Sequence, residues 1–320
     1  MTLLIDGRRA LFEGLVDYAG LFPPASLPMG DAAAEYRRAR ADPNGWMLGR
    51  FLCPASRLDE LAGLLTGSMT AGEPAWGIGV VFDGPAAAAA LQAASFDRYM
   101  TPAATVVVVE ARAPAEASDG SPVADAADTI APILDAAFAV SADVMPFIEI
   151  TFGASWENGI PNAVAALADL RKRRLHPAGA KMRMGGLVAE AFPSALQVAV
   201  FIIACVARDL PFKATAGLHH PVRHEDAEMG VWRHGFLNLL AATALAADEA
   251  PTETVTAAVS ETDAGAFTVS PAGLAWRERR LPVAILRRVR LEILPAYGSC
   301  SFDEPVTDLV NMGILLGSAV

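Results

Sequence analysis

Strand-like and helical segments that alternate along the chain predict an α/β protein of the (β/α)8, TIM-type barrel class. Eight alternations occupy roughly 270 residues, close to the ~250 residues usual for this fold. The strand-like runs are apolar at consecutive positions, as in Val106–Val109, which is typical of parallel strands covered on both faces. A doubly wound open sheet is the alternative. Against it, no Gly-x-Gly-x-x-Gly motif follows the first strand and the chain contains no Walker loop.

The expected strands are short runs rich in apolar and β-branched residues, and the expected helices are the longer, alanine-rich segments between them. We expect strands at 17–22, 47–53, 76–82, 105–110, 146–151, 179–184, 212–215 and 266–270. We expect helices at 31–40, 56–65, 85–94, 123–140, 156–175, 193–208, 232–247 and 252–261. Helix-start signals support several of these; for example, Ser56 is followed by Asp59 and Glu60.

The alternation ends near Trp276, and the next residues are rich in arginine. We therefore expect a barrel over residues 1–275 and a short C-terminal extension, residues 276–320, packed on the same domain.

Composition narrows the class of protein. The 320 residues are 53% hydrophobic and 19% charged, enough apolar residues for a large core. A net charge of −11 argues against binding to nucleic acid or to anionic membranes. The apolar stretch 195–207 is shorter than the ~20 residues of a membrane span, so we expect a buried helix there.

Three widely spaced cysteines imply no disulfide framework, and charged residues near the start exclude a signal peptide. We expect a cytoplasmic protein.

The small number of lysines and their positions are the first indication of a catalytic site. Only three of the 25 basic residues are lysine: Lys172 in a basic helix end, and Lys181 and Lys213 in the sixth and seventh expected strands. Neighbouring strands lie ~4.8 Å apart, so two inward-facing ammonium groups, with Arg183 on the same face, would repel one another. Repulsion and burial would lower a lysine pKa and give a free amine for Schiff-base formation or base catalysis. The alternative is that these groups bind an anion or pair with Glu110 and Glu149.

Both strands end in glycine-containing segments, Lys181-Met-Arg-Met-Gly-Gly186 and Phe212-Lys-Ala-Thr-Ala-Gly217. Glycine lets a ligand approach the backbone closely, and the carboxyl ends of barrel strands are where catalytic residues lie. We expect Gly185, Gly186 and Thr215 to contact the substrate.

These two segments resemble the deoxyribose-phosphate aldolases and related class I aldolases, in which a Schiff-base lysine on strand six is followed by a second lysine on strand seven. The resemblance implies that Lys181 forms the iminium ion and that Lys213 lowers its pKa. Arg183 and the histidine loop after residue 217 depart from that pattern. Over nearly its full length the chain also resembles a bacterial protein family to which no reaction is assigned, through Asp17-Tyr-Ala-Gly-Leu-Phe-Pro-Pro24, His219-His-Pro and Ser299-Cys-Ser-Phe-Asp-Glu-Pro305.

Four of the five histidines fall within sixteen residues: His219, His220, His224 and His234. A histidine cluster at a barrel mouth is typical of a metal site, an acid–base pair or an anion site. The metal-ligand candidates are His219 and His224. The substrate-contact candidates are His219, His220 and Arg223, together with Arg183 of the sixth expected strand. A purely structural loop is the third alternative.

Carboxylates and a cysteine complete the candidates. Glu149, on the fifth strand, is expected to relay protons or orient the substrate. Asp17, Asp83 and Glu110 lie at other strand ends. The segment Gly298-Ser-Cys-Ser301 could present a nucleophile, although Ser301 also suits a helix N-cap.

The sequence therefore predicts a lyase, aldolase-like, that acts on a small anionic carbonyl metabolite carrying a phosphate or carboxylate. The catalytic residues would be Lys181, Lys213 and Glu149, and this mechanism needs no cofactor. One alternative is a divalent-metal-dependent hydrolase or lyase that uses the His219-His220-His224 loop. Another is a non-catalytic ligand-binding barrel. The alanine-rich helix surfaces are compatible with a homodimer.

Overall fold

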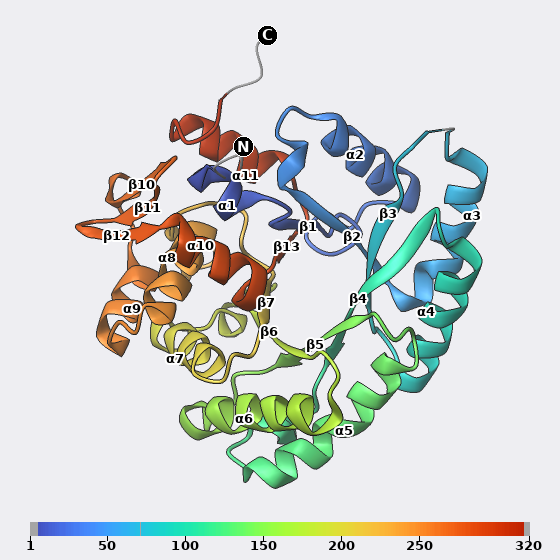
Figure 1. Ribbon diagram of the computed structural model, residues 1–320, viewed down its shortest axis with the longest axis horizontal. Helices are drawn as coiled ribbons and strands as arrows, with labels where there is room; N and C mark the ends of the chain where they lie inside the picture. The colour runs from blue at the N-terminus through green and yellow to red at the C-terminus, as the bar shows by residue number, and fades with distance from the viewer. Residues whose placement is uncertain (1–5, 71, 317–320) are drawn as a thin grey trace.

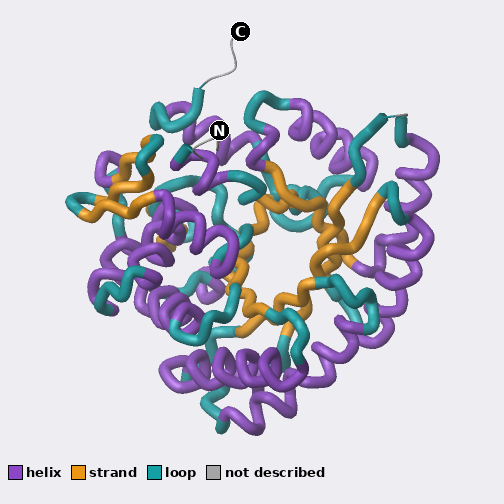
Figure 2. The backbone as a smooth tube through the Cα atoms, viewed as in Figure 1, coloured by secondary structure: helices purple, strands orange, loops and turns teal. Residues whose placement is uncertain are grey.

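A closed barrel of eight parallel strands, ringed by helices, forms the centre of the molecule (Figures 1 and 2). The computed structural model describes residues 6–70 and 72–316. Strand order around the barrel is β1-β13-β7-β6-β5-β4-β3-β2, and β1 pairs with both β2 and β13. Because no barrel strand has a free edge, the expected (β/α)8 class is confirmed and the open-sheet alternative is wrong.

Each barrel strand is followed by a helix on the outside. The barrel strands are β1 (Val16–Tyr18), β2 (Leu48–Pro54), β3 (Trp76–Val81), β4 (Ala104–Arg112), β5 (Met145–Ile150), β6 (Gly179–Arg183), β7 (Phe212–Thr215) and β13 (Tyr297–Ser299). The helices that follow them in turn are α2 (Met29–Ala41), α3 (Leu58–Ser68), α4 (Ala86–Met100), α5 (Val123–Phe138), α6 (Trp156–Arg174), α7 (Ala195–Val206), α8 (Phe236–Ala247) and α11 (Asp303–Asn311).

The eighth strand is not where the sequence placed it. Residues 267–270 form the first strand of a small antiparallel sheet, whereas β13 closes the barrel. In that small sheet Phe267 and Val269 are buried while Thr268 is exposed, the alternation of a sheet with one solvated face. All three residues of β13 are buried, as are those of its neighbour β1. The expected division at residue 275 is therefore also wrong, because the last strand and its helix lie in the segment 276–320.

A long insertion joins β7 to β13 and holds most of the non-barrel structure. It contains a hairpin, a helix after α8, a three-stranded sheet and a helix that continues as a π-helix; these are β8 (His224–Asp226), β9 (Val231–Arg233), α9 (Thr252–Ser260), β10 (Phe267–Ser270), β11 (Gly273–Trp276), β12 (Arg279–Pro282), α10 (Val283–Arg288) and Val289–Ile293. Helix α1 (Gly7–Phe12) contacts α10 and this sheet. Short 3-10 turns occur at Gly45–Met47, Ala55–Arg57, Ala115–Ser118, Ala189–Ala191 and Ala264–Ala266.

The apolar helix α7 belongs to the helical layer. Ser194 and Gln197 form a capping box that fixes its start. Its buried side chains, Phe201 and Ile202 among them, pack against the barrel, and the helix contacts α6, α8 and α9. Within the described residues, Ala189–Val206 is the one helical segment whose length and apolar composition would suit a membrane span. Its packing agrees with the expected buried helix.

Period-two alternation decides which side chains enter the barrel. On β7, Phe212 packs outward against Phe201 of α7, with ring centroids 5.4 Å apart. Its neighbour Lys213 therefore points inward. The same alternation turns Lys181, Glu110, Glu149 and Asp17 toward the interior, and all five charged side chains are buried.

Candidate active site

The two strand lysines lie side by side. Lys181 of β6 and Lys213 of β7 are direct register partners, so their side chains leave neighbouring strands at the same level. Lys213 is 1% exposed and Lys181 is 5% exposed. The sequence expectation that these amines would share one neighbourhood inside the barrel agrees with this geometry.

Carboxylates separate the two ammonium groups. Glu110 of β4 lies between them, with Oε1 2.6 Å from Nζ of Lys213 and Oε2 2.8 Å from Nζ of Lys181. Lys181 also contacts Glu149 of β5 at 3.0 Å, and Lys213 donates to Asp17 of β1. The charges thus alternate in sign across the barrel instead of accumulating.

Arginine side chains from β2, β4 and β6 continue this alternation of positive and negative charges. Arg50 lies 3.3 Å from Asp17, while Arg183 and Arg112 approach the same oxygen of Glu149 at 3.4 and 3.7 Å. The complete sequence of contacts is Arg50–Asp17–Lys213–Glu110–Lys181–Glu149, ending at Arg183 and Arg112. Each buried charge of this network therefore has an opposite charge in contact, which offsets the cost of its burial.

The expected lowering of the lysine pKa is wrong for Lys181. Burial alone would lower its pKa, but the Glu110 and Glu149 carboxylates outweigh that effect and raise the pKa above its ordinary value. Conversely, burial alone would raise the pKa of Glu110, but Lys181 and Lys213 lower it to about 2. The pKa of Glu149 is also lowered, because Lys181 and Arg183 outweigh its burial. Lys181 is therefore an ammonium group at neutral pH.

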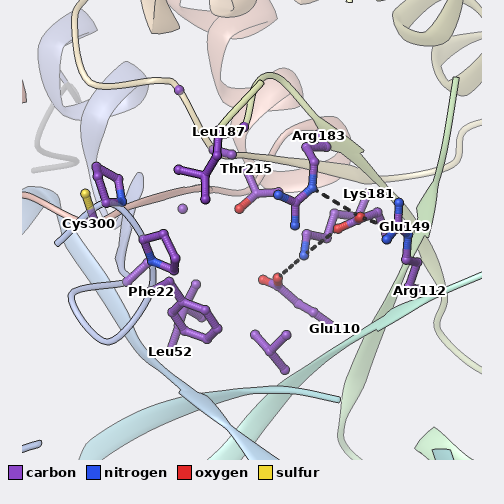
Figure 3. Close-up of a pocket in the computed structure, with 18 of the residues that line it drawn as sticks. Phe22, Leu52, Glu110, Arg112, Glu149, Lys181, Arg183, Leu187, Thr215 and Cys300 are labelled. Carbon is purple, nitrogen blue, oxygen red and sulfur yellow. Dashed lines mark hydrogen bonds and ion pairs between the residues drawn. The ribbon is translucent and has the colours of Figure 1, made fainter. Parts of the chain in front are cut away.

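A cavity of about 420 Å³ opens above this network, at the carboxyl ends of the barrel strands. Lys181, Glu110 and Glu149 reach it from below, and Figure 3 shows the dashed contacts between them. Cations around it come from Arg112, Arg183 and Arg233. Apolar side chains, including Phe22, Leu52 and Leu187, form much of the remaining wall. The cavity thus offers an amine, carboxylates and exposed cations to one small molecule.

The structure brings only some of the predicted substrate contacts to this cavity. Arg183, Gly186, Thr215 and His219 line it, together with Lys181 and Glu149. Lys213 lies deeper and does not line it. Gly185 instead makes room for the ring of Phe192.

Two further candidates are turned away from the cavity wall. The Arg223 guanidinium stacks on Trp232 at 4.4 Å, and burial lowers its pKa. His220 contacts Asp308 of α11 through Nδ1 at 2.6 Å.

The histidine loop divides among separate environments. His219 contacts Glu304 of α11, whereas the ring of His224 packs edge-on against His220, with centroids 4.7 Å apart. Burial lowers the pKa of His224, and it lowers that of His234 to about 4. Within residues 6–70 and 72–316, no three or more His, Cys, Asp or Glu side chains gather as a metal site would require. A metal-binding role for His219 and His224 stays a prediction.

Three features of this site go beyond what the sequence predicts. Glu110, expected as a strand-end carboxylate and as one alternative partner of the lysines, bridges both of them. Arg112 and Arg233 line the cavity, and neither is among the expected site residues. Cys300, expected only as part of a segment that could present a nucleophile, lines the cavity. It follows Gly298 by two residues and so shares its inward face, and that spacing is the signal for its position.

Comparison with known proteins identifies neither a family nor an activity for this chain. No protein-family model matches the chain, and no curated protein matches it. Among solved structures it is similar to a lysine/ornithine decarboxylase complexed with cadaverine from Vibrio vulnificus, with 13% identity and a TM-score of 0.36. The match covers 65% of this chain and 48% of that one, so the chain spans about half the length of that protein. The barrel topology itself establishes the fold class.

Proposed function

We propose that this protein is a lyase of the aldolase type, in which Lys181 forms an imine with a small anionic carbonyl compound. The observation that carries the proposal is the position of Lys181. Among the described residues it is the lysine that lines the cavity, and its Nζ lies within 3.0 Å of two carboxylates. A nucleophilic amine needs a proton acceptor at hand, and these carboxylates supply one.

Substrate binding provides the trigger that frees the amine. Arg112 and Arg183 are 67% and 48% exposed, yet both point to Glu149. A phosphate or carboxylate that enters the cavity attracts both guanidinium groups. Glu149 then loses two neighbouring cations, becomes a stronger base, and takes the proton of Lys181. Glu110 remains held between two ammonium groups and is the weaker acceptor.

The bond changes then balance without a cofactor. Neutral Lys181 adds to the carbonyl carbon, and one of its N–H protons passes to the carbonyl oxygen to give a carbinolamine. Protonated Glu149 then returns its proton to the carbinolamine hydroxyl, which leaves as water. The resulting iminium ion accepts the electron pair of the adjacent carbon–carbon bond while Glu149 removes the proton of the β-hydroxyl group. An aldehyde leaves, and the enamine is protonated by Glu149 and hydrolysed.

Deuterium exchange tests this function without knowledge of the full substrate. An enamine intermediate exchanges the α-protons of a carbonyl donor with D₂O, and proton NMR measures the loss of signal. We expect exchange with at least one of pyruvate, dihydroxyacetone phosphate and glyceraldehyde 3-phosphate. Lys181→Arg keeps the positive charge but cannot form an imine, since arginine is not deprotonated in proteins, so exchange should stop.

Lys172→Arg is the matched control, because Lys172 is exposed on α6 and already lies among arginines. It should exchange at the wild-type rate. Exchange that persists in Lys181→Arg, or exchange of none of these compounds by the wild-type protein, would contradict the proposal.

A further inference from the structure

A second reactive group faces the same cavity. Cys300 follows β13 and His219 follows β7, and both line the cavity. The Sγ of Cys300 lies 3.7 Å from Nε2 of His219, and Nδ1 of His219 lies 2.7 Å from Oε2 of Glu304. The three side chains therefore form a continuous thiol–imidazole–carboxylate arrangement.

The order of these contacts fixes the role of the imidazole. The Glu304 carboxylate accepts a hydrogen bond from Nδ1–H, so Nε2 has a free lone pair that faces the thiol. This is the arrangement in which histidine removes a thiol proton while a third group orients the ring. Glu304 thus positions His219, and His219 is the proton acceptor.

The adjacent histidine provides an internal comparison. His220 contacts Asp308, also on α11, through its own Nδ1 at 2.6 Å. It does not line the cavity, and its ring packs against His224. Two neighbouring histidines are therefore each oriented by a carboxylate of one helix, but only His219 also contacts a thiol.

We propose that Cys300, His219 and Glu304 form a nucleophilic thiol centre that binds an aldehyde as a reversible thiohemiacetal. The thiol proton moves to Nε2 of His219, Sγ bonds to the aldehyde carbon, and the carbonyl oxygen takes the proton from His219. No oxidant or reductant is needed. This proposal extends the proposed function, because an aldehyde is what carbon–carbon cleavage at Lys181 releases.

The position of Cys300, across the cavity from Lys181, suits the binding of a released aldehyde. Figure 3 shows Cys300 on one side of the cavity and Lys181, Glu110 and Glu149 on the other. Cleavage divides the substrate into a part bound to Lys181 and an aldehyde that departs from it. The thiol centre would hold the departing aldehyde and prevent its return to the enamine.

The thiol is protonated at rest. Burial, Glu304 and Glu35 raise the pKa of Cys300, and the backbone N–H of Ala25 opposes them. Tyr18, whose hydroxyl donates to Glu35, is a further titratable group nearby. Attack by Cys300 therefore depends on proton removal by His219 during the reaction, not on a preformed thiolate.

Thiol alkylation tests the centre. Cys53 and Cys205 are fully buried, so iodoacetamide should modify Cys300 first, and peptide mass spectrometry identifies the site. In His219→Gln the alkylation rate constant of Cys300 should fall roughly tenfold or more, because the proton acceptor is lost. In the matched variant His220→Gln the alkylation rate constant of Cys300 should stay within about twofold of the wild-type value. Equal rates in the two variants would overturn the proposal.

Protection by an aldehyde tests the adduct and separates it from the lysine chemistry. Glyoxylate is the probe, and glycolate, which has the same carboxylate but no carbonyl group, is its control. In Lys181→Arg, which forms no imine, glyoxylate should still slow alkylation of Cys300 and glycolate should not. Protection by both compounds, or by neither, would refute the thiohemiacetal. Protection by glyoxylate and not by glycolate would support the thiohemiacetal, even if reduction with borohydride trapped no imine on Lys181.

Discussion

Glu110 keeps two ammonium groups together inside the barrel. Its two oxygens contact different lysines, and its side chain is 2% exposed. Replacing one member of a buried charge network leaves its partners uncompensated, which costs more than the network contributes as a whole. Asp17 and Glu149 each compensate one of the lysines, whereas Glu110 is the carboxylate that contacts both.

We predict that Glu110→Gln lowers the free energy of unfolding by about 3–5 kcal/mol, as measured by urea denaturation. Glu13→Gln is the control, because Glu13 forms an exposed ion pair with Arg9 at 3.1 Å. Such pairs contribute about 0–1 kcal/mol. Equal losses in both variants would show that Glu110 does not compensate the buried lysines.

The contacts of the two strand lysines differ in how far the sequence could predict them. Adjacent parallel strands are neighbours by rule, so the pairing of Lys181 with Lys213 could be predicted. Glu110 is three strands from Lys213 along the sheet, and only closure of the barrel brings them into contact across the interior. Pairing with Glu110 and Glu149 is the alternative that the sequence leaves open, and these carboxylates give the lysine pKa the opposite direction from the one expected for two unpaired cations.

At the scale of elements, helix α6 depends on a glycine. A Cβ at Gly159 would overlap the backbone oxygen of Ser118 in the 3-10 turn before α5, whereas a Cβ at Gly63 of α3 meets nothing within 4 Å. The two helical glycines therefore respond oppositely to the same substitution.

We predict that Gly159→Ala destabilises the protein by about 1–3 kcal/mol, because α6 must move away from the turn. Gly63→Ala should stabilise it by about 0.5–1 kcal/mol, since alanine favours an exposed helix. Thermal unfolding of both variants measures the difference. A stabilised Gly159→Ala protein would mean that α6 does not pack this closely.

Element boundaries were predictable where a strand was long and continuously apolar. Strands β2 to β7 and the helices that follow them lie close to their expected ranges, whereas β1 (Val16–Tyr18) is shorter than the expected 17–22. The eighth failed because β13 has only three residues, including Gly298, and follows a long insertion, whereas β10 is longer and richer in apolar residues. Hydrogen bonding to β1 and β7, which no local pattern reveals, identifies β13 as the barrel strand.

For the whole molecule, the charge network sets a pH window of stability. The pKa of Glu110 is lowered from 4.5 to about 2, so its contribution to stability is complete above pH 4.5 and is lost as the pH falls toward 2. The pKa of Lys181 is raised above 10.5, so its contribution is complete below that value and is lost at higher pH.

We therefore predict that the network's contribution is constant between about pH 5 and pH 10 and declines outside that range. Circular dichroism melting curves at a series of pH values measure it. In Glu110→Gln the loss of melting temperature between pH 4.5 and pH 2 should be smaller than in the wild type. An unchanged acid slope in that variant would contradict the assignment of the low pKa to Glu110.

The central claim is that Lys181 becomes a nucleophile when an anionic carbonyl compound enters the cavity. Borohydride reduction during incubation with such a compound, followed by mass spectrometry, tests it most directly, because the chain has three lysines and peptide mapping separates them. We predict a reduced adduct on Lys181 that is absent in Lys181→Arg and unchanged in Lys172→Arg. An adduct distributed over all three lysines would contradict the account. So would the absence of an adduct on Lys181 with every aldehyde and keto acid tested.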